Sequence, residues 1–195
     1  MKKILLTGLF AVLIAAGFAQ KPYKVVFYNF ENLFDTIDDP GVNDTEFTPE
    51  GPKKWNAYKY AKKIGNLERV LFDIASADGD FPIVIGVSEV ENRSVMEDVI
   101  ATPKLSKGNY RIVHYDSPDA RGVDVGFYYR PDVFKLEGSA AIPFKMPEMP
   151  NFKTRDFVTM WGTIENEQFF FLVSHWRAWA ARRLRTPSVW LRPAR

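Results

Sequence analysis

Apolar residues in this chain gather in short runs that are separated by polar loops. Residues 24–30 (KVVFYNF), 82–87 (PIVIGV) and 169–174 (FFFLVS) are nearly continuous apolar segments of strand length. Runs of this kind are typical of strands that are buried on both faces. They therefore predict central strands of a packed domain.

Each of these strands leads directly into polar residues that can bind a metal or transfer a proton. Asn29 and Glu31 lie at the end of the first strand, Glu89 follows the second, and His175 closes the third. In α/β proteins ligands bind just beyond the strand ends. We therefore expect Asn29, Glu31, Glu89 and His175 to converge on one shared site.

The remaining pattern alternates helices with strands first and then places strands one after another. Helical spacing of three and four predicts a helix over residues 55–75, with an apolar face made by Tyr60, Ile64, Leu67, Leu71 and Ile74. A short helix is expected over 94–100. Further strands are expected at 110–115, 123–130, 134–142, 157–164 and 168–174. No internal repeat or linker is visible, so we predict one domain, a mixed-sheet α/β sandwich.

The first 19 residues have the pattern of a signal peptide. Lys2 and Lys3 precede an apolar stretch at 4–16, and Gly17-Phe18-Ala19 offers small residues at a cleavage site. The stretch is shorter than the ~20 residues a membrane span needs, so we expect cleavage after Ala19 and no stable membrane span. The chain has no cysteine. Export without disulfides indicates a periplasmic or extracellular protein.

The formal net charge of +2 is unevenly distributed. Residues 20–176 hold 18 basic and 24 acidic side chains, whereas residues 177–195 hold six arginines and no acid. An acidic body is not the basic surface that usually binds nucleic acid. To accept a phosphate it would need a divalent cation or local basic residues.

The polar residues at the strand ends each have a functional and a structural interpretation. The amide and carboxylate oxygens of Asn29 and Glu31 suit a hard cation such as Mg²⁺, or they form an ordinary polar strand end. A carboxylate at Glu89 is costly at the end of a buried strand unless it is paired or bound to metal. Glu91 and Asn92 could instead cap the next helix.

Two histidines and one loop complete the candidate chemistry. His175 is a candidate acid–base group, or an exposed strand-end residue beside Trp176, while His114 is expected to be structural. In the loop DSPDARGVD, Arg121 can fork onto a phosphate, and Asp124 can orient a histidine or bind metal. The alternative is a turn with a solvated salt bridge. The sequence contains no serine elbow, P-loop, dinucleotide glycine fingerprint or zinc-type Cys/His spacing.

Five segments together resemble secreted bacterial members of the endonuclease/exonuclease/phosphatase family. They are FYNFENLFD (27–35), FTPEGPKKW (47–55), IGVSEVEN (85–92), VHYDSPDARGVDVGFYYRP (113–131) and LVSHW (172–176). The resemblance implies a four-layer α/β sandwich with two mixed β-sheets flanked by helices, incomplete in this chain. It also implies Mg²⁺-dependent hydrolysis of phosphate esters, of the nuclease or phosphodiesterase type, with Mn²⁺ or Ca²⁺ as alternative cations.

The same resemblance assigns roles to individual residues. It implies Glu89, Glu31 and Asn29 as metal ligands, with Glu89 and His175 as catalytic residues. Substrate contacts fall to Asn29, Arg121 and Asp124. The implied substrate is a phosphate ester, in nucleic acid or in a phospholipid or inositol-phosphate head group.

The family pattern continues beyond the His-Trp pair with an Asp-x-Asn motif and a later Asp-His pair, which this sequence lacks. We therefore expect residues 20–176 to be the N-terminal part of the family domain. We expect the Arg-rich residues 177–195 to be an atypical tail produced by a reading-frame shift, and the chain to be an inactive fragment. Two alternatives stay open: a genuine basic tail that binds an anionic partner, and a non-catalytic exported module that binds a phosphate-bearing or other ligand.

Overall fold

The computed structural model describes residues 22–77 and 79–176. The expected signal peptide and the expected atypical tail lie outside these residues. The chain contains, in order, β1 (Val25–Leu33), η1 (Thr45–Phe47), α2 (Ala57–Ser76), β2 (Val84–Val90), α3 (Arg93–Ile100), η2 (Leu105–Gly108), β3 (Arg111–His114), β4 (Asp124–Tyr129), β5 (Phe134–Ile142), β6 (Phe157–Ile164) and β7 (Glu167–Val173). Within the described residues, no helix has the length and apolar character to cross a membrane.

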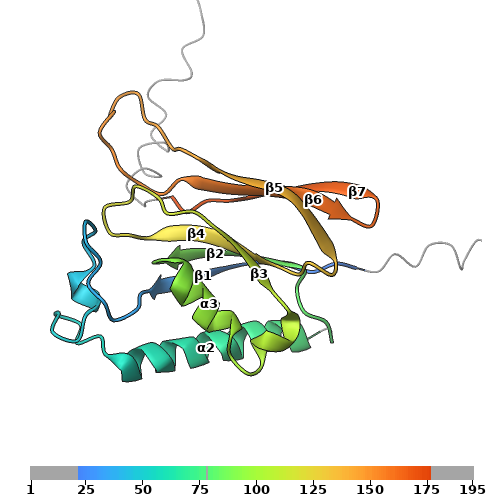
Figure 1. Cartoon of the computed structure of the whole chain (residues 1–195), viewed down its shortest axis with the longest axis horizontal. Coiled ribbons are helices and arrows are strands. Elements are labelled where there is room, and N and C mark those ends of the chain that lie inside the picture. Colours follow the sequence, from blue (N-terminus) through green and yellow to red (C-terminus); the bar gives the residue numbers. More distant parts are fainter. Residues whose placement is uncertain (1–21, 78, 177–195) are drawn as a thin grey trace, which may run out of the picture.

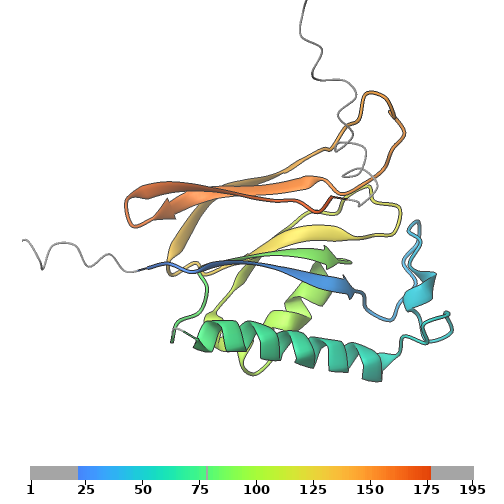
Figure 2. The same cartoon turned by 180° about the vertical axis from the view of Figure 1, so that it is seen from behind.

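Two sheets stack face to face, and the helices cover one side of the stack (Figure 1). The first sheet has the strand order β1-β2-β4-β3, with β1 and β2 parallel and the other pairs antiparallel. The second sheet has the order β5-β6-β7 and is wholly antiparallel. Helices α2 and α3 lie against the outer face of the first sheet (Figure 2).

Two apolar cores hold these layers together. Between the helices and the first sheet, Leu67 and Leu71 of α2 pack in one buried cluster with Phe30 and Tyr128. Between the two sheets, Phe127 of β4 packs in a second cluster with residues of β5, β6 and β7. The second cluster also contains Val173, so the packing of the sheets against each other positions the chain that follows β7.

The helices begin where their capping residues place them. The Asn56 side chain accepts a hydrogen bond from the Lys59 amide at 3.1 Å, and α2 starts at Ala57. The Asn92 side chain accepts one from the Val95 amide at 3.0 Å, which confirms Asn92 as the cap of α3. Satisfying these amides at the first turn sets both helix boundaries.

The expected elements are confirmed with shifts of a few residues, and one feature of the expected sandwich is corrected. The second sheet is antiparallel rather than mixed, and the tight turn between β6 and β7 can join only antiparallel neighbours. The described residues place helices on the first sheet alone and so form three of the four layers, which agrees with the expectation of an incomplete sandwich (Figure 1).

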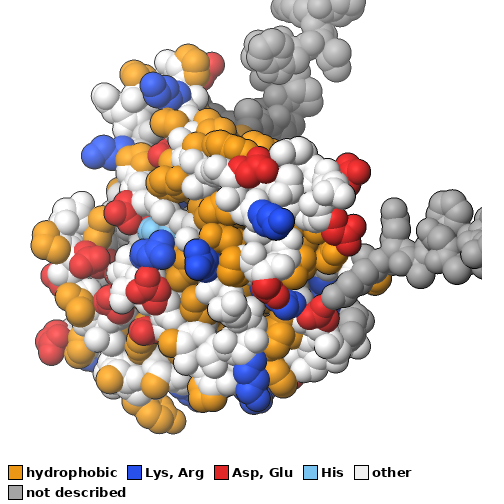
Figure 3. Space-filling view, turned by 45° about the vertical axis from the view of Figure 1, so that its right-hand side comes forward, with side chains coloured by type: hydrophobic (Ala, Val, Ile, Leu, Met, Phe, Trp, Pro, Cys, Tyr) orange, Lys and Arg blue, Asp and Glu red, His pale blue; other side chains and the backbone are white. Residues whose placement is uncertain are grey.

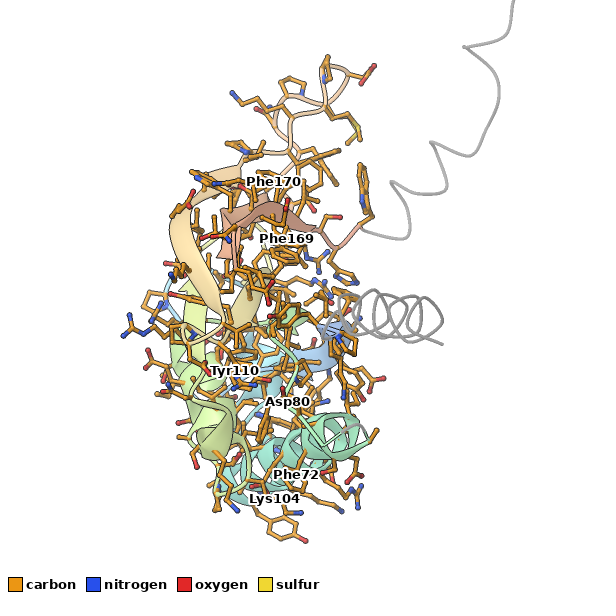
Figure 4. The ribbon with its side chains drawn as sticks, turned by 90° about the vertical axis from the view of Figure 1, so that its right-hand side faces the viewer. Phe72, Asp80, Lys104, Tyr110, Phe169 and Phe170 are labelled. Atoms are coloured by element: carbon orange, nitrogen blue, oxygen red, sulfur yellow. The ribbon has the colours of Figure 1, made fainter. Side chains whose placement is uncertain are left out.

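Several large apolar side chains remain exposed on the second sheet and on β1. Phe170 and Leu172 of β7 and Phe27 of β1 are each more than half exposed. Figure 3 shows hydrophobic side chains gathered on one face of the molecule, and Figure 4 shows Phe169 and Phe170 in the second sheet, far from Phe72 of α2. Large exposed apolar patches are uncommon on monomeric soluble proteins and often mark interaction surfaces.

Candidate functional site

The site begins with two strand irregularities that lie side by side. β1 and β2 pair in register as far as Asn29 and Ser88, and the register shifts before Leu33 pairs with Val90. Within this interval Glu31 and Glu89 have φ angles of 53° and 59°, in the left-handed region. Such backbone costs roughly 1–3 kcal/mol per residue and is concentrated at functional sites. The two bulges therefore hold both glutamates out of the regular ladder.

Asn29 and Glu31 are tied to each other at the end of β1. The Asn29 side-chain oxygen accepts a hydrogen bond from the Glu31 amide at 2.7 Å. This bond fixes the rotamer of the Asn29 amide and leaves one lone pair on its oxygen. Asn29 pairs with Ser88 in the parallel ladder, and Ser88 directly precedes Glu89. The structure thus brings these three predicted residues to one edge of the sheet.

Lys63 of α2 also reaches this edge, which the sequence interpretation missed. Its Nζ donates to the Glu31 carbonyl oxygen at 3.2 Å. Burial lowers the pKa of Lys63, while the charges of Glu31 and Glu89 act in the opposite direction. Lys63 therefore places a cation within electrostatic range of both glutamates. Nothing in the sequence separates it from neighbouring Lys62 on the polar side of the helix.

Glu89 meets His175 across the two sheets. His175 Nε2 lies 3.4 Å from Glu89 Oε1, and the two side chains are 24% and 17% exposed. His175 Nδ1 is buried and makes no hydrogen bond within the described residues. The predicted convergence of β1, β2 and the end of β7 is thus present in the structure.

The surroundings of His175 favour its neutral form. Burial lowers its pKa most, and the charge of Arg155 lowers it further. The charge of Glu89 raises the pKa, Arg121 lowers it, and Asp119 raises it. A neutral imidazole can accept a proton at one nitrogen while it donates from the other.

Arg121 and Arg155 are held beside His175 by one buried carboxylate. Asp119 is 2% exposed as a residue, and its Oδ2 lies 3.6 Å from Arg155 Nε. Its Oδ1 accepts the Arg121 amide at 3.0 Å and lies 3.8 Å from Arg121 Nε. Both guanidinium groups act electrostatically on His175. Paired guanidinium groups are a common way to bind a phosphate.

The sequence interpretation found Arg121 but missed Arg155 and Asp119. Asp119 lies in the loop already singled out, two residues before Arg121. Arg155 comes just before the apolar strand β6. A charged residue next to an apolar strand was the signal that identified Glu89, and the same signal at the start of a strand could have found Arg155.

The predicted substrate residue Asp124 has both carboxylate oxygens engaged inside the fold. Its Oδ2 lies 3.1 Å from His114 Nε2, and its Oδ1 accepts the Ser117 amide at 3.0 Å. Asp124 is 3% exposed, and the His114 side chain is equally buried. The geometry corresponds to the alternative in which Asp124 orients a histidine. His114 has the structural environment that was expected for it.

The donor atoms around Glu89 fit a hard divalent cation. Glu89, Glu31 and Asn29 offer carboxylate and amide oxygens, which Mg²⁺ prefers. Within the described residues, the Glu89 carboxylate contacts His175. The lowered pKa of His175 favours the neutral imidazole, so this contact does not supply a permanent positive charge. A cation here would complete its coordination with water and substrate oxygens, as Mg²⁺ commonly does.

A family-wide sequence profile, described as the Endonuclease/Exonuclease/phosphatase family, matches residues 24–186. The chain belongs to the endonuclease/exonuclease/phosphatase family. The matched segment contains every site residue described above. A search of curated proteins finds no match for the sequence.

Several solved structures are similar to the chain over part of their length. A humanized D. rerio TDP2 matches with 12% identity and a TM-score of 0.45, covering 77% of this chain and 45% of that one. A Bacteroides vulgatus endonuclease/exonuclease/phosphatase matches with 14% identity and a TM-score of 0.45, covering 78% and 52%. A Bacteroides thetaiotaomicron mannosyl-6-phosphatase matches with 16% identity and a TM-score of 0.43, covering 77% and 49%. The chain spans about half the length of each.

Proposed function

We propose that this site binds the phosphate of a phosphate ester together with a divalent cation and supports its hydrolysis. The observation that carries the proposal is the contact of Glu89 with His175 across the two sheets, flanked by Arg121 and Arg155. A carboxylate that could bind a metal, an imidazole that could transfer a proton and guanidinium groups that attract an anion thus lie close together. The family to which the chain belongs is consistent with this chemistry.

The proposed role of each residue follows from its charge. Glu89, Glu31 and Asn29 would hold the cation, which supplies Lewis-acid stabilisation of the charge that develops on phosphorus. Arg121, whose side chain is 43% exposed, would receive the non-bridging phosphate oxygens, while the buried Arg155 would add positive charge behind His175. Lys63 would add a positive charge on the helix side of the same edge. Mg²⁺ is the proposed ion, with Mn²⁺ or Ca²⁺ as alternatives.

His175 would hold or move a proton at the reacting phosphate. Its neutral imidazole can donate a hydrogen bond from one nitrogen to a phosphate or leaving-group oxygen, and it can accept a proton at the other nitrogen to become the imidazolium. The nearby Glu89 carboxylate stabilises the imidazolium whenever the proton resides on His175. The arrangement resembles other sites in which a carboxylate orients a histidine for proton transfer.

The substrate class stays open between nucleic acid and a phospholipid or inositol-phosphate head group. The net acidic body argues against long-range attraction of nucleic acid. The exposed guanidinium of Arg121 suits a single phosphate group of any of these substrates. We also retain the proposal that the protein is exported, on the basis of its N-terminal pattern.

The alternative is a non-catalytic exported module that binds a phosphate-bearing ligand through the same residues. The two functions share ligand binding and differ in turnover, so one experiment with two readouts separates them.

The test measures binding and hydrolysis of bis(p-nitrophenyl) phosphate by the purified chain, with Mg²⁺ and with EDTA. We expect Mg²⁺-dependent binding that is lost in Glu89→Gln and retained in Glu97→Gln, which neutralises an exposed glutamate paired with Arg93. If the chain hydrolyses the diester, His175→Gln should lower the rate by about 10²–10⁴-fold. Binding without turnover would establish the non-catalytic module. Binding that is equal in EDTA or in Glu89→Gln would refute the proposed site.

A further inference from the structure

A second group of carboxylates lies beside the candidate site but outside it. Asp39 and Asp44 belong to the loop that follows β1, and Glu91 is the first residue after β2. One carboxylate oxygen from each lies within 4.8 Å of the others. These three residues, here called the acidic cluster, are joined from two chain segments that the parallel pairing of β1 and β2 brings together.

Two of the three carboxylates are buried with an oxygen that makes no hydrogen bond within the described residues. Asp44 is 1% exposed and Glu91 is 5% exposed. Asp44 Oδ1 and Glu91 Oε1 make no close hydrogen bond there, although the Asp38 carboxyl lies within range of the Asp44 side chain. The other oxygen of each is already fixed, because Asp44 Oδ2 accepts the Asp39 amide at 3.0 Å and Glu91 Oε2 accepts the Asp35 amide at 2.7 Å. The backbone therefore orients both carboxylates.

Among residues 22–77 and 79–176, no lysine or arginine forms an ion pair with the acidic cluster. Burial raises the pKa of Asp39, and the charges of Asp35, Asp44 and Asp116 raise it further. Buried carboxylates that repel one another and have no counter-charge must become protonated or bind a cation.

We propose that Asp39, Asp44 and Glu91 bind a Ca²⁺ ion at a site separate from that of Glu89. Calcium takes oxygen ligands at roughly 2.3–2.6 Å, so opposed ligand oxygens of one ion lie up to roughly 5 Å apart. The spacing within the acidic cluster falls inside that limit. The remaining positions would be filled by water or by backbone carbonyl oxygens of the loop.

Calcium suits this cluster better than magnesium because the ligands come from an irregular loop. Mg²⁺ requires a nearly ideal octahedron at a shorter distance, whereas Ca²⁺ accepts varied geometry and several carboxylates. The bound ion would tie the loop after β1 to the end of β2. The ion would thereby stabilise the adjacent ends of β1 and β2, which carry Glu31 and Glu89, without taking part in phosphate chemistry. The inference does not depend on the proposed hydrolytic function.

The decisive comparison uses the Asp44→Asn/Glu91→Gln variant, whose amide oxygens can still accept the Asp39 and Asp35 amides. We expect Ca²⁺, titrated alone into the chelator-treated full chain by calorimetry, to bind the wild type. We expect the variant to bind it more than about 100-fold more weakly. Saturating Ca²⁺ should raise the wild-type Tm by about 5–10 °C. In EDTA, without bound Ca²⁺, we expect the variant to have a higher Tm than the wild type, because the repulsion between like charges is removed.

Two controls separate this site from the rest of the molecule. Glu46→Gln/Glu50→Gln removes two acids from the same loop outside the acidic cluster and should bind Ca²⁺ as the wild type does. Glu89→Gln should also retain the calorimetric signal, which distinguishes the cluster from the proposed catalytic cation. The wild type failing to bind Ca²⁺ at 1 mM (about 10⁻³ M, the weak end of biological Ca²⁺ sites) would overturn the proposal, whatever the variants do. Loss of Ca²⁺ binding in Glu89→Gln alone would overturn it as well.

Discussion

Glu89 and His175 face each other from different sheets, with Oε1 of the glutamate 3.4 Å from Nε2 of the histidine. Glu89 sits on the bulge at the end of β2, and His175 follows β7. Their contact exists because the inter-sheet core packs Val173 against residues of the first sheet. The candidate site is therefore a product of sheet packing.

The pKa of His175 should respond with opposite signs to its neighbours. Glu89→Gln removes a charge that raises this pKa, so the pKa should fall below the wild-type value. Arg121→Met removes a charge that lowers it, so the pKa should rise. NMR titration of the two imidazoles in EDTA measures both changes. Shifts of the same sign in the two variants would show that these charges do not act on His175.

Arg155→Met should destabilise the protein strongly, because it leaves Asp119 in a buried site with less counter-charge. Removing one partner of a buried ion pair costs about 3–5 kcal/mol. Arg93→Met breaks an exposed pair with Glu97 on α3 and should cost less than about 1 kcal/mol. Urea unfolding of the two variants gives the comparison. Equal losses would mean that the Arg155–Asp119 pair is not buried as described.

Two glycines should respond oppositely to alanine. A Cβ at Gly162 of β6 would collide with the carbonyl oxygen of Lys135 in β5, so Gly162→Ala should cost about 1–3 kcal/mol. A Cβ at Gly65 of α2 would meet no other atom, so Gly65→Ala should stabilise by about 0.5–1 kcal/mol through helix propensity. Thermal unfolding distinguishes the two, and a stabilised Gly162→Ala would contradict the β5–β6 register.

The metal-free protein should become less stable as the pH rises through neutrality. Burial raises the pKa of Glu91 to about 8, above the ordinary glutamate value of 4.5. Between these values the folded state holds a proton that the unfolded state releases, so the free energy of unfolding falls as the pH increases. Glu91→Gln should remove this part of the pH dependence. Unfolding measured in EDTA from pH 5 to 9 checks it, and an identical slope in both proteins would contradict the prediction.

The local pattern of the sequence was sufficient for most of the fold. The run at 134–142 corresponds to β5 residue for residue, and the helix expected at 55–75 is α2 with a shift at each end. These elements follow from short-range periodicity and from caps such as Asn56, which act within a few residues. The strand ends also marked Asn29, Glu31, Glu89 and His175, because an abrupt change from apolar to polar is itself local.

Other features were decided only by tertiary structure. Lys63 reaches Glu31 because α2 lies against the first sheet, and Arg155 joins His175 because the second sheet folds over it. Asp44 and Glu91 meet because β1 and β2 pair in parallel, which brings the ends of both strands to one edge. Sequence determines which side chains are available and where each strand ends. Which of them share a site depends on packing between distant segments, and that packing is a sum of many weak contacts that no single local pattern reveals.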